Sequence, residues 1–368
     1  MIDINKISRQ CIREFKEYVP GKPVEEVKRE LGLENVLKLS SNESPLGASP
    51  MAVQAMIKEL KENCHYYPES LCPVLAGKLA QIHKLDPDQF FINNGVDGVL
   101  SMIAIAIIDC GDEVVTSQFS FQAYENVTTR MGGKIILVPQ TVDHRFDIDG
   151  IIGALTPQTK IVFLCNPNNP TGTITTRAEF ERLLAAVPEN TLVVSDEAYY
   201  DFVEDPAYPQ TISYLKKYTN LVITRTFSKA MGLAGLRIGY AIAHPEIIKV
   251  LRKVTDPFPV NRIAQAGALA GLDDHEFLRC SVEIIREGRK QVYDGLLKMG
   301  LSPVPSQANF VYVDLGMPST PIYERMLRLG VIVRPLAPQG MPTSLRFTVG
   351  TPDQNNRALN TLAKALEN

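Results

Sequence analysis

The sequence predicts an α/β fold: a mainly parallel sheet of seven strands covered by helices, followed by a smaller α/β domain. The first observation is that short apolar runs alternate with longer helical segments between about residues 89 and 243. The second is that these runs are continuously apolar, which is typical of parallel strands buried on both faces. The third is a change after residue 255, where a long helical stretch precedes three further apolar runs.

Composition and charge limit the classes of partner. The chain has 368 residues, 45% of them hydrophobic, which fits two domains with sizeable cores. The formal net charge of -3 gives no basic field for nucleic acid or for an anionic membrane. The longest apolar run, residues 99–108, has about half the length that a bilayer span needs. We therefore expect neither a nucleic-acid partner nor a membrane partner.

The cysteines and histidines indicate neither a disulfide framework nor a metal site. The six cysteines form no C-x-x-C pair, and the five histidines lie far apart without an H-x-x-x-H pattern. In a chain of this length, scattered cysteines indicate reduced thiols. A disulfide between Cys64 and Cys72, the closest pair, is the alternative. The charged N-terminal residues contain no apolar signal-peptide core, so we expect a cytoplasmic protein.

The N-terminal part is expected to form an arm that packs with the small domain. Within it, residues 24–31 (VEEVKREL) have helical periodicity and lie between turn-rich segments. Ser49 and Pro50 then start a helix, with serine as the cap and proline at the first helical position. The expected division is an arm over 1–45, a large domain over 46–255 and a small domain over 256–368.

Seven apolar runs are expected to form the large sheet. They are FFIN (90–93), EVVTS (113–117), KIILV (134–138), KIVFLC (160–165), TLVVS (191–195), LVIT (221–224) and IGYAIA (238–243). In the small domain, a helical stretch over 261–300 leads to NFVYVDL (309–315), VIVRPL (331–336) and SLRFTVG (344–350).

Polar residues follow five of these runs, at the point where each strand ends. The clusters are NGVD (94–97), QFSFQAY (118–124), NPNNPTG (166–172), DEAY (196–199) and RTFSK (225–229). Parallel sheets bind their ligands outside the carboxyl ends of the strands. The five clusters are therefore expected to form one site.

The residue types in these clusters indicate a particular cofactor. Lys229 stands among small residues, and a lysine recruited for chemistry forms a covalent bond to a carbonyl or acts as a base. Asp196 ends a very apolar strand, where a buried carboxylate needs a partner such as a cationic ring nitrogen. Gly95 precedes a helix whose free N–H groups favour a phosphate. Further phosphate donors would be Thr226, Ser228 and Arg237. Pyridoxal phosphate requires a lysine, a buried carboxylate and a phosphate site of this kind.

A family resemblance supports this interpretation. The run TFSKAMGLAG (226–235) resembles the lysine signature of class I/II aminotransferases, which have the fold-type-I architecture of pyridoxal-phosphate enzymes. NPNNPTG, DEAY and GLRIG are similar to other motifs of the family, in the same order. The resemblance covers nearly the whole chain. Within the superfamily, YVPGKP, LSSNESPLG, YYPE (66–69) and LRFTVGT most resemble histidinol-phosphate aminotransferases.

The resemblance implies roles for the cofactor-binding residues. Lys229 would carry the cofactor, Asp196 would pair with its ring nitrogen, and Phe121 would stack on its ring. The ring's phenolic oxygen would accept hydrogen bonds from Asn169 and Tyr199. The expected phosphate ligands are the amides of Val96 and Asp97, with Thr226, Ser228 and Arg237.

The resemblance also implies a shared site and a substrate pocket. Tyr67 would reach the phosphate of the partner subunit, which implies a homodimer with shared active sites. Arg346 matches the arginine that binds a substrate carboxylate. Arg334, Tyr18 and Asn42 match positions that line the substrate pocket.

The implied reaction is a two-step transamination in histidine biosynthesis. L-Histidinol phosphate and 2-oxoglutarate would give imidazole acetol phosphate and L-glutamate, with the freed Lys229 amine as the general base. Two alternatives stay open, because aromatic amino acid aminotransferases share the same cofactor residues and phosphothreonine decarboxylases are also similar.

Many relatives have tyrosine at Phe121 and glutamate at Gly98. These departures suggest a sub-branch with its own substrate preference.

Overall fold

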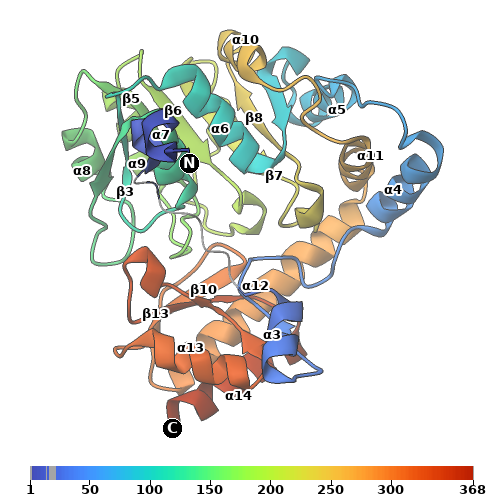
Figure 1. Ribbon diagram of the computed structural model, residues 1–368, viewed down its shortest axis with the longest axis vertical. Helices are drawn as coiled ribbons and strands as arrows, with labels where there is room; N and C mark the ends of the chain where they lie inside the picture. The colour runs from blue at the N-terminus through green and yellow to red at the C-terminus, as the bar shows by residue number, and fades with distance from the viewer. Residues whose placement is uncertain (1, 14, 16–21, 368) are drawn as a thin grey trace.

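The computed structural model describes residues 2–13, 15 and 22–367. Figure 1 shows two bodies, each built on its own sheet, with the long helix α12 (His275–Lys298) running between them. The larger body holds a seven-stranded sheet and the smaller one a four-stranded sheet. The predicted α/β fold is confirmed.

The large sheet has the strand order β2-β8-β7-β6-β5-β3-β4. Its strands are β2 (Phe90–Asn93), β3 (Glu113–Ser117), β4 (Lys134–Val138), β5 (Thr159–Cys165), β6 (Leu192–Asp196), β7 (Leu221–Thr226) and β8 (Gly239–Ala243). All pairs among β3 to β7 are parallel, whereas β8 is antiparallel to both of its neighbours. Each of the seven predicted runs is a strand. The reversed direction of β8 was not predicted.

Helices cover this sheet, which explains its continuously apolar strands. They are α5 (Pro73–His83), α6 (Gly95–Ile107), α7 (Ala123–Met131), α8 (Ile148–Gly153), α9 (Arg177–Ala186) and α10 (Pro245–Val254). Two further helices, α4 (Pro50–Asn63) and α11 (Arg262–Gly271), pack against each other at the edge of this body. Every residue of β6 and β8 is buried. As predicted, Ser49 caps α4 by accepting a hydrogen bond from the Ala52 amide, and Pro50 takes the first helical position.

The small sheet is antiparallel, with the order β12-β13-β10-β9. Its strands are β9 (Ser302–Pro303), β10 (Phe310–Asp314), β12 (Arg334–Pro335) and β13 (Ser344–Thr348), and α13 (Ser319–Arg328) and α14 (Pro352–Glu367) complete this body with α12. The predicted run at 331–336 is divided between β11 (Val331–Ile332) and β12. The short strand β11 pairs in parallel with β1 (Leu37–Lys38).

The N-terminal segment contacts both bodies. Val27 of α3 (Val24–Leu31) packs in a small apolar cluster with Leu327 and Ile332 of the small body. Further upstream, the Arg9 guanidinium donates to the carbonyl of Met131, 3.1 Å away at the end of α7. In Figure 1 the N-terminal residues accordingly lie beside α7, while α3 lies beside α13.

The packing of helix α11 bears on where the large and small domains divide. Helix α11 follows the predicted boundary at residue 255, yet its buried residues Ala264 and Ala268 belong to the core of the large sheet. Gly267 allows close packing on α4, since a Cβ there would lie 2.9 Å from the Cγ atom of Met56. We propose that the large domain extends through α11 and that the small domain starts at α12.

The glycine at position 98, in the first turns of α6, has a local structural reason. A Cβ at this position would lie 2.8 Å from the Oδ1 atom of Asn93, closer than atoms in van der Waals contact. The buried Asn93 side chain is held in place, because its Oδ1 accepts from the Asn94 amide at 2.7 Å and its Nδ2 donates to Thr255 Oγ1 at 2.9 Å. The asparagine therefore occupies the space that a larger side chain on α6 would need.

We expect Gly98→Ala to destabilise the protein by about 1–3 kcal/mol, because overpacking outweighs the gain in helix propensity. Gly77→Ala in α5 is the matched control, since a Cβ at Gly77 would meet no atom within 4 Å. Thermal unfolding of both variants measures the difference. Equal or higher melting temperatures for both would contradict the packing explanation.

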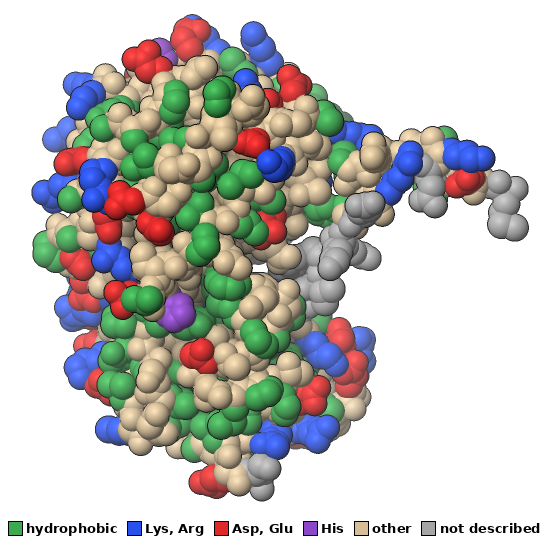
Figure 2. All heavy atoms as spheres, turned by 90° about the vertical axis from the view of Figure 1, so that its left-hand side faces the viewer, with side chains coloured by type: hydrophobic (Ala, Val, Ile, Leu, Met, Phe, Trp, Pro, Cys, Tyr) green, Lys and Arg blue, Asp and Glu red, His purple; other side chains and the backbone are tan. Residues whose placement is uncertain are grey.

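All six cysteines are free, so Cys64 and Cys72 are not bonded to each other. Within the described residues, no helix combines the length and apolar character needed to cross a bilayer. The same residues contain no cluster of three or more histidine, cysteine or acidic side chains that could hold a metal ion. On the face shown in Figure 2, basic and acidic side chains are interspersed.

Candidate active site

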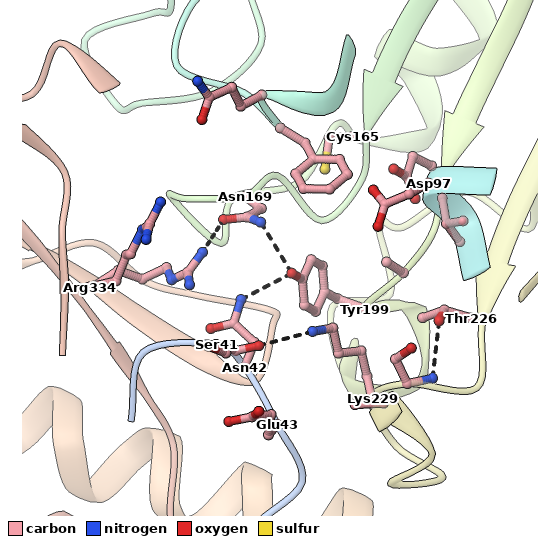
Figure 3. Close-up of a pocket in the computed structure, with 18 of the residues that line it drawn as sticks. Ser41, Asn42, Glu43, Asp97, Cys165, Asn169, Tyr199, Thr226, Lys229 and Arg334 are labelled. Atoms are coloured by element: carbon pink, nitrogen blue, oxygen red, sulfur yellow. Dashed lines mark hydrogen bonds between the residues drawn. The ribbon is translucent and has the colours of Figure 1, made fainter. Parts of the chain in front are cut away.

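A cavity of about 380 Å³ lies where the carboxyl ends of the large sheet's strands face the small sheet. All five predicted polar clusters contribute to its wall. The predicted site residues that line it are Asn42, Val96, Asp97, Phe121, Asn169, Asp196, Tyr199, Thr226, Ser228, Lys229, Arg237, Arg334 and Arg346. Figure 3 shows several of them converging on one space from β6, β7, the small sheet and the segment around Asn42.

Two predicted site residues do not line this cavity. Tyr67 is 79% exposed and lines a separate hollow together with Arg262 and Asn261. Its predicted role requires a second chain, so its position in one chain does not test it. Tyr18 lies outside the described residues.

Lys229 follows β7 and is half-buried in the cavity. Its Nζ atom donates a hydrogen bond to the Ser41 carbonyl at 3.2 Å and lies 5.7 Å from the ring centre of Tyr199 (Figure 3). Burial, helped by the nearby positive charge of Arg346, lowers the pKa of Lys229 to about 8. A substantial fraction of its amine is therefore neutral and nucleophilic near physiological pH.

The small residues after Lys229 allow the chain to turn tightly. Gly232 has a φ of +69°, and a Cβ there would lie only 1.8 Å from the carbonyl oxygen of Gly47. Only glycine fits this contact between the turn and the segment that leads to α4. The turn thereby places Lys229 opposite Ser41.

Asp196 ends β6 and is 1% exposed. Its Oδ2 accepts a hydrogen bond from the Tyr124 hydroxyl at 2.8 Å, and its Oδ1 accepts one from the Thr224 hydroxyl at 3.1 Å. Burial raises the pKa of Asp196 to about 6, and the two hydrogen bonds oppose that shift. At pH 7 the site therefore presents a buried carboxylate that is mostly ionised and suited to a cationic ring nitrogen.

The Tyr199 hydroxyl receives two amide donors. Asn42 Nδ2 donates to it at 3.0 Å and Asn169 Nδ2 at 3.2 Å (Figure 3). Burial raises the pKa of Tyr199, so the hydroxyl keeps its proton and can donate to a ligand oxygen. Asn42 has a left-handed φ of 55°, and its backbone N–H donates a hydrogen bond to Thr348 Oγ1 at 2.9 Å.

The other end of the cavity has the donors for an anion. Helix α6 begins at Gly95, and the side chain of Arg237 lies against this end, with its guanidinium 3.0 Å from the Asp97 carboxylate. A Cβ on Gly95 would meet the Arg237 guanidinium at 2.7 Å, so glycine makes this approach feasible. The Thr226 hydroxyl accepts from the Ser228 amide at 3.0 Å in the adjoining loop. Helix N–H groups, two hydroxyls and a guanidinium thus surround one location.

Two guanidinium groups belong to the small-sheet side of the cavity. Arg334 of β12 and Arg346 of β13 are register partners, and paired residues in antiparallel strands share a face. Arg346 is 6% exposed and donates to the Ser40 carbonyl at 2.7 Å and to Asn169 Oδ1. Its sequence neighbours Leu345 and Phe347 are buried in the small domain's core.

The donor set can be tested against pyridoxal phosphate group by group. Lys229, with its lowered pKa, fits an aldehyde; the ionised Asp196 fits a protonated ring nitrogen; and Asn169 and Tyr199 fit a phenolic oxygen. The donors near Gly95 fit a phosphate. The residues present therefore fit this cofactor.

Sequence reasoning did not identify Tyr124 or Thr224, the two residues that hold Asp196. Thr224 precedes the polar cluster on β7, and its role depends on the pairing of β6 with β7. Tyr124 lies in the first turn of α7, three residues after Phe121, which precedes the helix. That spacing was the available signal, but it does not reveal the contact with Asp196.

Comparisons with known proteins agree with this geometry. The family model for aminotransferases of class I and II matches residues 34–362. Histidinol-phosphate aminotransferase 2 of Carboxydothermus hydrogenoformans is 44% identical over 360 residues, which cover 98% of this chain and 99% of the relative. A protein of the same name from Pseudomonas aeruginosa is 42% identical over 368 residues, covering 100% of this chain and 99% of the relative.

Solved structures show the same likeness. Histidinol-phosphate aminotransferase from Sinorhizobium meliloti, in complex with pyridoxal-5'-phosphate, has a TM-score of 0.89 and 28% identity, covering 97% of both chains. Thermus thermophilus aspartate aminotransferase with maleate has a TM-score of 0.82 at 24% identity over 97% of this chain and 99% of that chain, which shows a shared fold alone. The family match spans both sheets and every cavity-lining segment described above. The chain therefore belongs to the class I and II aminotransferases.

Proposed function

We propose that this protein is a histidinol-phosphate transaminase that uses pyridoxal phosphate. It would move an amino group from L-histidinol phosphate to 2-oxoglutarate, giving imidazole acetol phosphate and L-glutamate, in histidine biosynthesis. The observation that carries the proposal is a single cavity containing both a lysine of lowered pKa and two arginines, Arg334 and Arg346. Relatives of this name along the whole chain support it.

The cavity residues would divide the work of holding the cofactor. Lys229 would bind its aldehyde carbon, Asp196 its ring nitrogen, and Asn169 and Tyr199 its phenolic oxygen, with Phe121 against the ring face. The phosphate would be bound by the Val96 and Asp97 amides, Thr226, Ser228 and Arg237. Bound pyridoxal phosphate would supply an electron sink for the negative charge that develops at the substrate's α-carbon.

The chain's own residues would position and move the proton. The Nζ atom of Lys229 would remove the proton from the substrate's α-carbon, and its pKa of about 8 suits a general base near neutral pH. The Asp196 carboxylate would provide a negative charge beside the cofactor's ring nitrogen. Asn42 and Asn169 hold the Tyr199 hydroxyl at a fixed place.

One binding end must accept two kinds of anion. The donor substrate carries a phosphate monoester and the acceptor carries a carboxylate. A guanidinium can donate two parallel N–H hydrogen bonds to either anion, which suits Arg346, with Arg334 beside it on the next strand. Asn42 would lie at the side of the bound substrate.

We expect the rate at which the cofactor-free enzyme captures pyridoxal phosphate to rise with pH and to level off above about pH 8. Below the pKa of about 8 the Lys229 amine is protonated and unreactive, and its neutral fraction falls tenfold per pH unit. Stopped-flow absorbance measures the rate. Binding of pyridoxamine phosphate, which has no aldehyde, is the control and should lack this dependence. If the capture rate had its pH midpoint near 10, the lowered pKa of Lys229 would be contradicted.

We propose that the protein works as a cytoplasmic homodimer with shared sites. Tyr67 is exposed and stacks on Phe258 with ring centres 4.7 Å apart, and exposed Ile57 and Leu60 lie nearby in the sequence on α4. A second chain over this surface would cover the apolar side chains and bring Tyr67 to the partner's phosphate site. The six free cysteines fit a reducing compartment. Sedimentation equilibrium measures the mass in solution.

The decisive experiment mixes cofactor-loaded protein with excess L-histidinol phosphate, without a keto acid, and follows the cofactor absorbance. Rapid loss of the original band with appearance of the aminated cofactor supports the proposal. L-Phenylalanine is the comparison substrate. Reaction with phenylalanine but not with histidinol phosphate would replace the proposed activity by that of an aromatic amino acid aminotransferase.

A further inference from the structure

We propose that Tyr124 is a positioning residue for the cofactor ring, through its hydroxyl on Asp196 and its ring edge against Phe121. The inference rests on the function proposed above. It assigns one residue of α7 to two tasks, orienting the carboxylate that faces the ring nitrogen and supporting the side chain that covers the ring.

The contacts of Tyr124 reach both groups. Its hydroxyl donates to Asp196 Oδ2 at 2.8 Å, and its ring meets that of Phe121 edge to face, with centres 5.7 Å apart and an interplanar angle of 88°. Its other aromatic contact is Phe163 of β5, stacked at 4.5 Å and 7°. Phe121 and Asp196 both line the cavity. Tyr124 therefore contacts two residues of the cavity wall, Phe121 and Asp196, without lining the cavity itself.

The Tyr124 side chain has little freedom to move. It is 0% exposed, and Phe163 fixes the plane of its ring. Its amide donates to the Phe121 carbonyl at 3.1 Å, and its own carbonyl accepts from the Thr128 hydroxyl at 2.7 Å. A shift of Tyr124 would therefore displace Phe121 and the Asp196 hydrogen bond together.

Electrostatics make the hydroxyl a permanent donor. Burial and the neighbouring Asp196 charge raise the pKa of Tyr124 well above its usual value, so the phenol keeps its proton across the working range. Burial alone disfavours the ionised form of Asp196, and the hydrogen bonds from Tyr124 and Thr224 favour it. A hydrogen bond to a buried charge is among the stronger kinds.

Tyr124→Phe tests the proposal because it removes one oxygen and keeps the aromatic contacts. The dissociation constant of pyridoxal phosphate should rise at least about tenfold. The pH midpoint at which the bound cofactor changes its absorbance should also rise. The reason is that the Asp196 carboxylate is less stabilised without the tyrosine hydroxyl. The proton between Asp196 and the ring nitrogen then lies more on the carboxylate, so the ring carries less positive charge.

Tyr312→Phe is the matched control. Tyr312 is likewise buried, and its hydroxyl shares a hydrogen bond of 2.8 Å with Ser344 in the small domain. The cofactor affinity of Tyr312→Phe should stay within about twofold of the wild-type value. The pH midpoint of its cofactor absorbance should not change. A role limited to stability would lower the melting temperature of Tyr124→Phe without moving the midpoint.

The outcomes separate this inference from the proposed function. Wild-type protein that neither binds pyridoxal phosphate nor transaminates overturns both. Active wild-type protein with an unchanged affinity or midpoint in Tyr124→Phe overturns this inference alone. Should that variant not fold, Thr224→Val removes the other hydrogen bond to Asp196, and a midpoint that does not rise there overturns the proposed tuning of the ring.

Discussion

Lys229→Ala is expected to lower turnover by at least about 10⁴-fold while the protein still binds its cofactor. The change removes both the amine that bonds the cofactor and the base that moves the α-proton. Asp196, Arg237 and the amides at the start of α6 stay in place, so binding without a covalent bond should persist. Steady-state kinetics with L-histidinol phosphate and 2-oxoglutarate, together with equilibrium dialysis of pyridoxal phosphate, measure the two effects.

Lys249→Ala is the control for this change. Lys249 lies on α10, is exposed and pairs with Glu246. It should leave turnover unchanged. Turnover of Lys229→Ala within tenfold of the wild type would remove the lysine from the mechanism.

Arg346→Ala is expected to lower the kcat/KM of both half-reactions by about 10²-fold or more, since it removes a buried charged partner for both substrate anions. Single-turnover measurements of the cofactor absorbance, with histidinol phosphate and with glutamate separately, give the two values. Arg346→Lys keeps the positive charge but loses the bidentate hydrogen-bonding geometry. It should therefore recover only part of the kcat/KM of each half-reaction. A defect in just one half-reaction would mean that the two anions bind at different residues.

Part of the expected loss for Arg346→Ala comes from the protein's own contacts. The Arg346 guanidinium also donates to Asn169, which in turn donates to the Tyr199 hydroxyl. Arg334→Ala leaves that chain of hydrogen bonds intact. Comparison of the two variants therefore separates the loss of anion binding from the loss of order around Tyr199.

The fold was largely predictable because burial on both faces produces continuous apolar runs. The direction of β8 was missed because an apolar run carries no sign of direction. A signal existed, however, since only the short 3-10 turn Ala234–Leu236 lies between β7 and β8. A parallel crossover usually contains an α-helix, whereas an antiparallel connection does not need one.

The cavity was predictable where chemistry concentrates at strand ends, as at Asp196 and Lys229. Residues that support the cavity wall without lining it were not predictable. Tyr124 is the example, because it contacts Asp196 only when α7 packs against the sheet. Tyr67 depends on a second chain, and its role stays a prediction. The composition of α11 does not reveal that it packs on α4, so the sequence alone could not indicate the later domain boundary that we propose.

The cavity joins residues from both ends of the chain. Asn42 and Ser40 bond directly to Thr348 and Arg346, and the members of each pair are 306 positions apart. A chain emerging from the ribosome therefore cannot complete this wall until β13 has been synthesised, although the large sheet is finished about a hundred residues earlier. Contacts of such sequence separation are costly to close and tend to form late. Acquisition of the anion-binding wall should thus mark the completion of synthesis, and chains truncated before β13 should lack it.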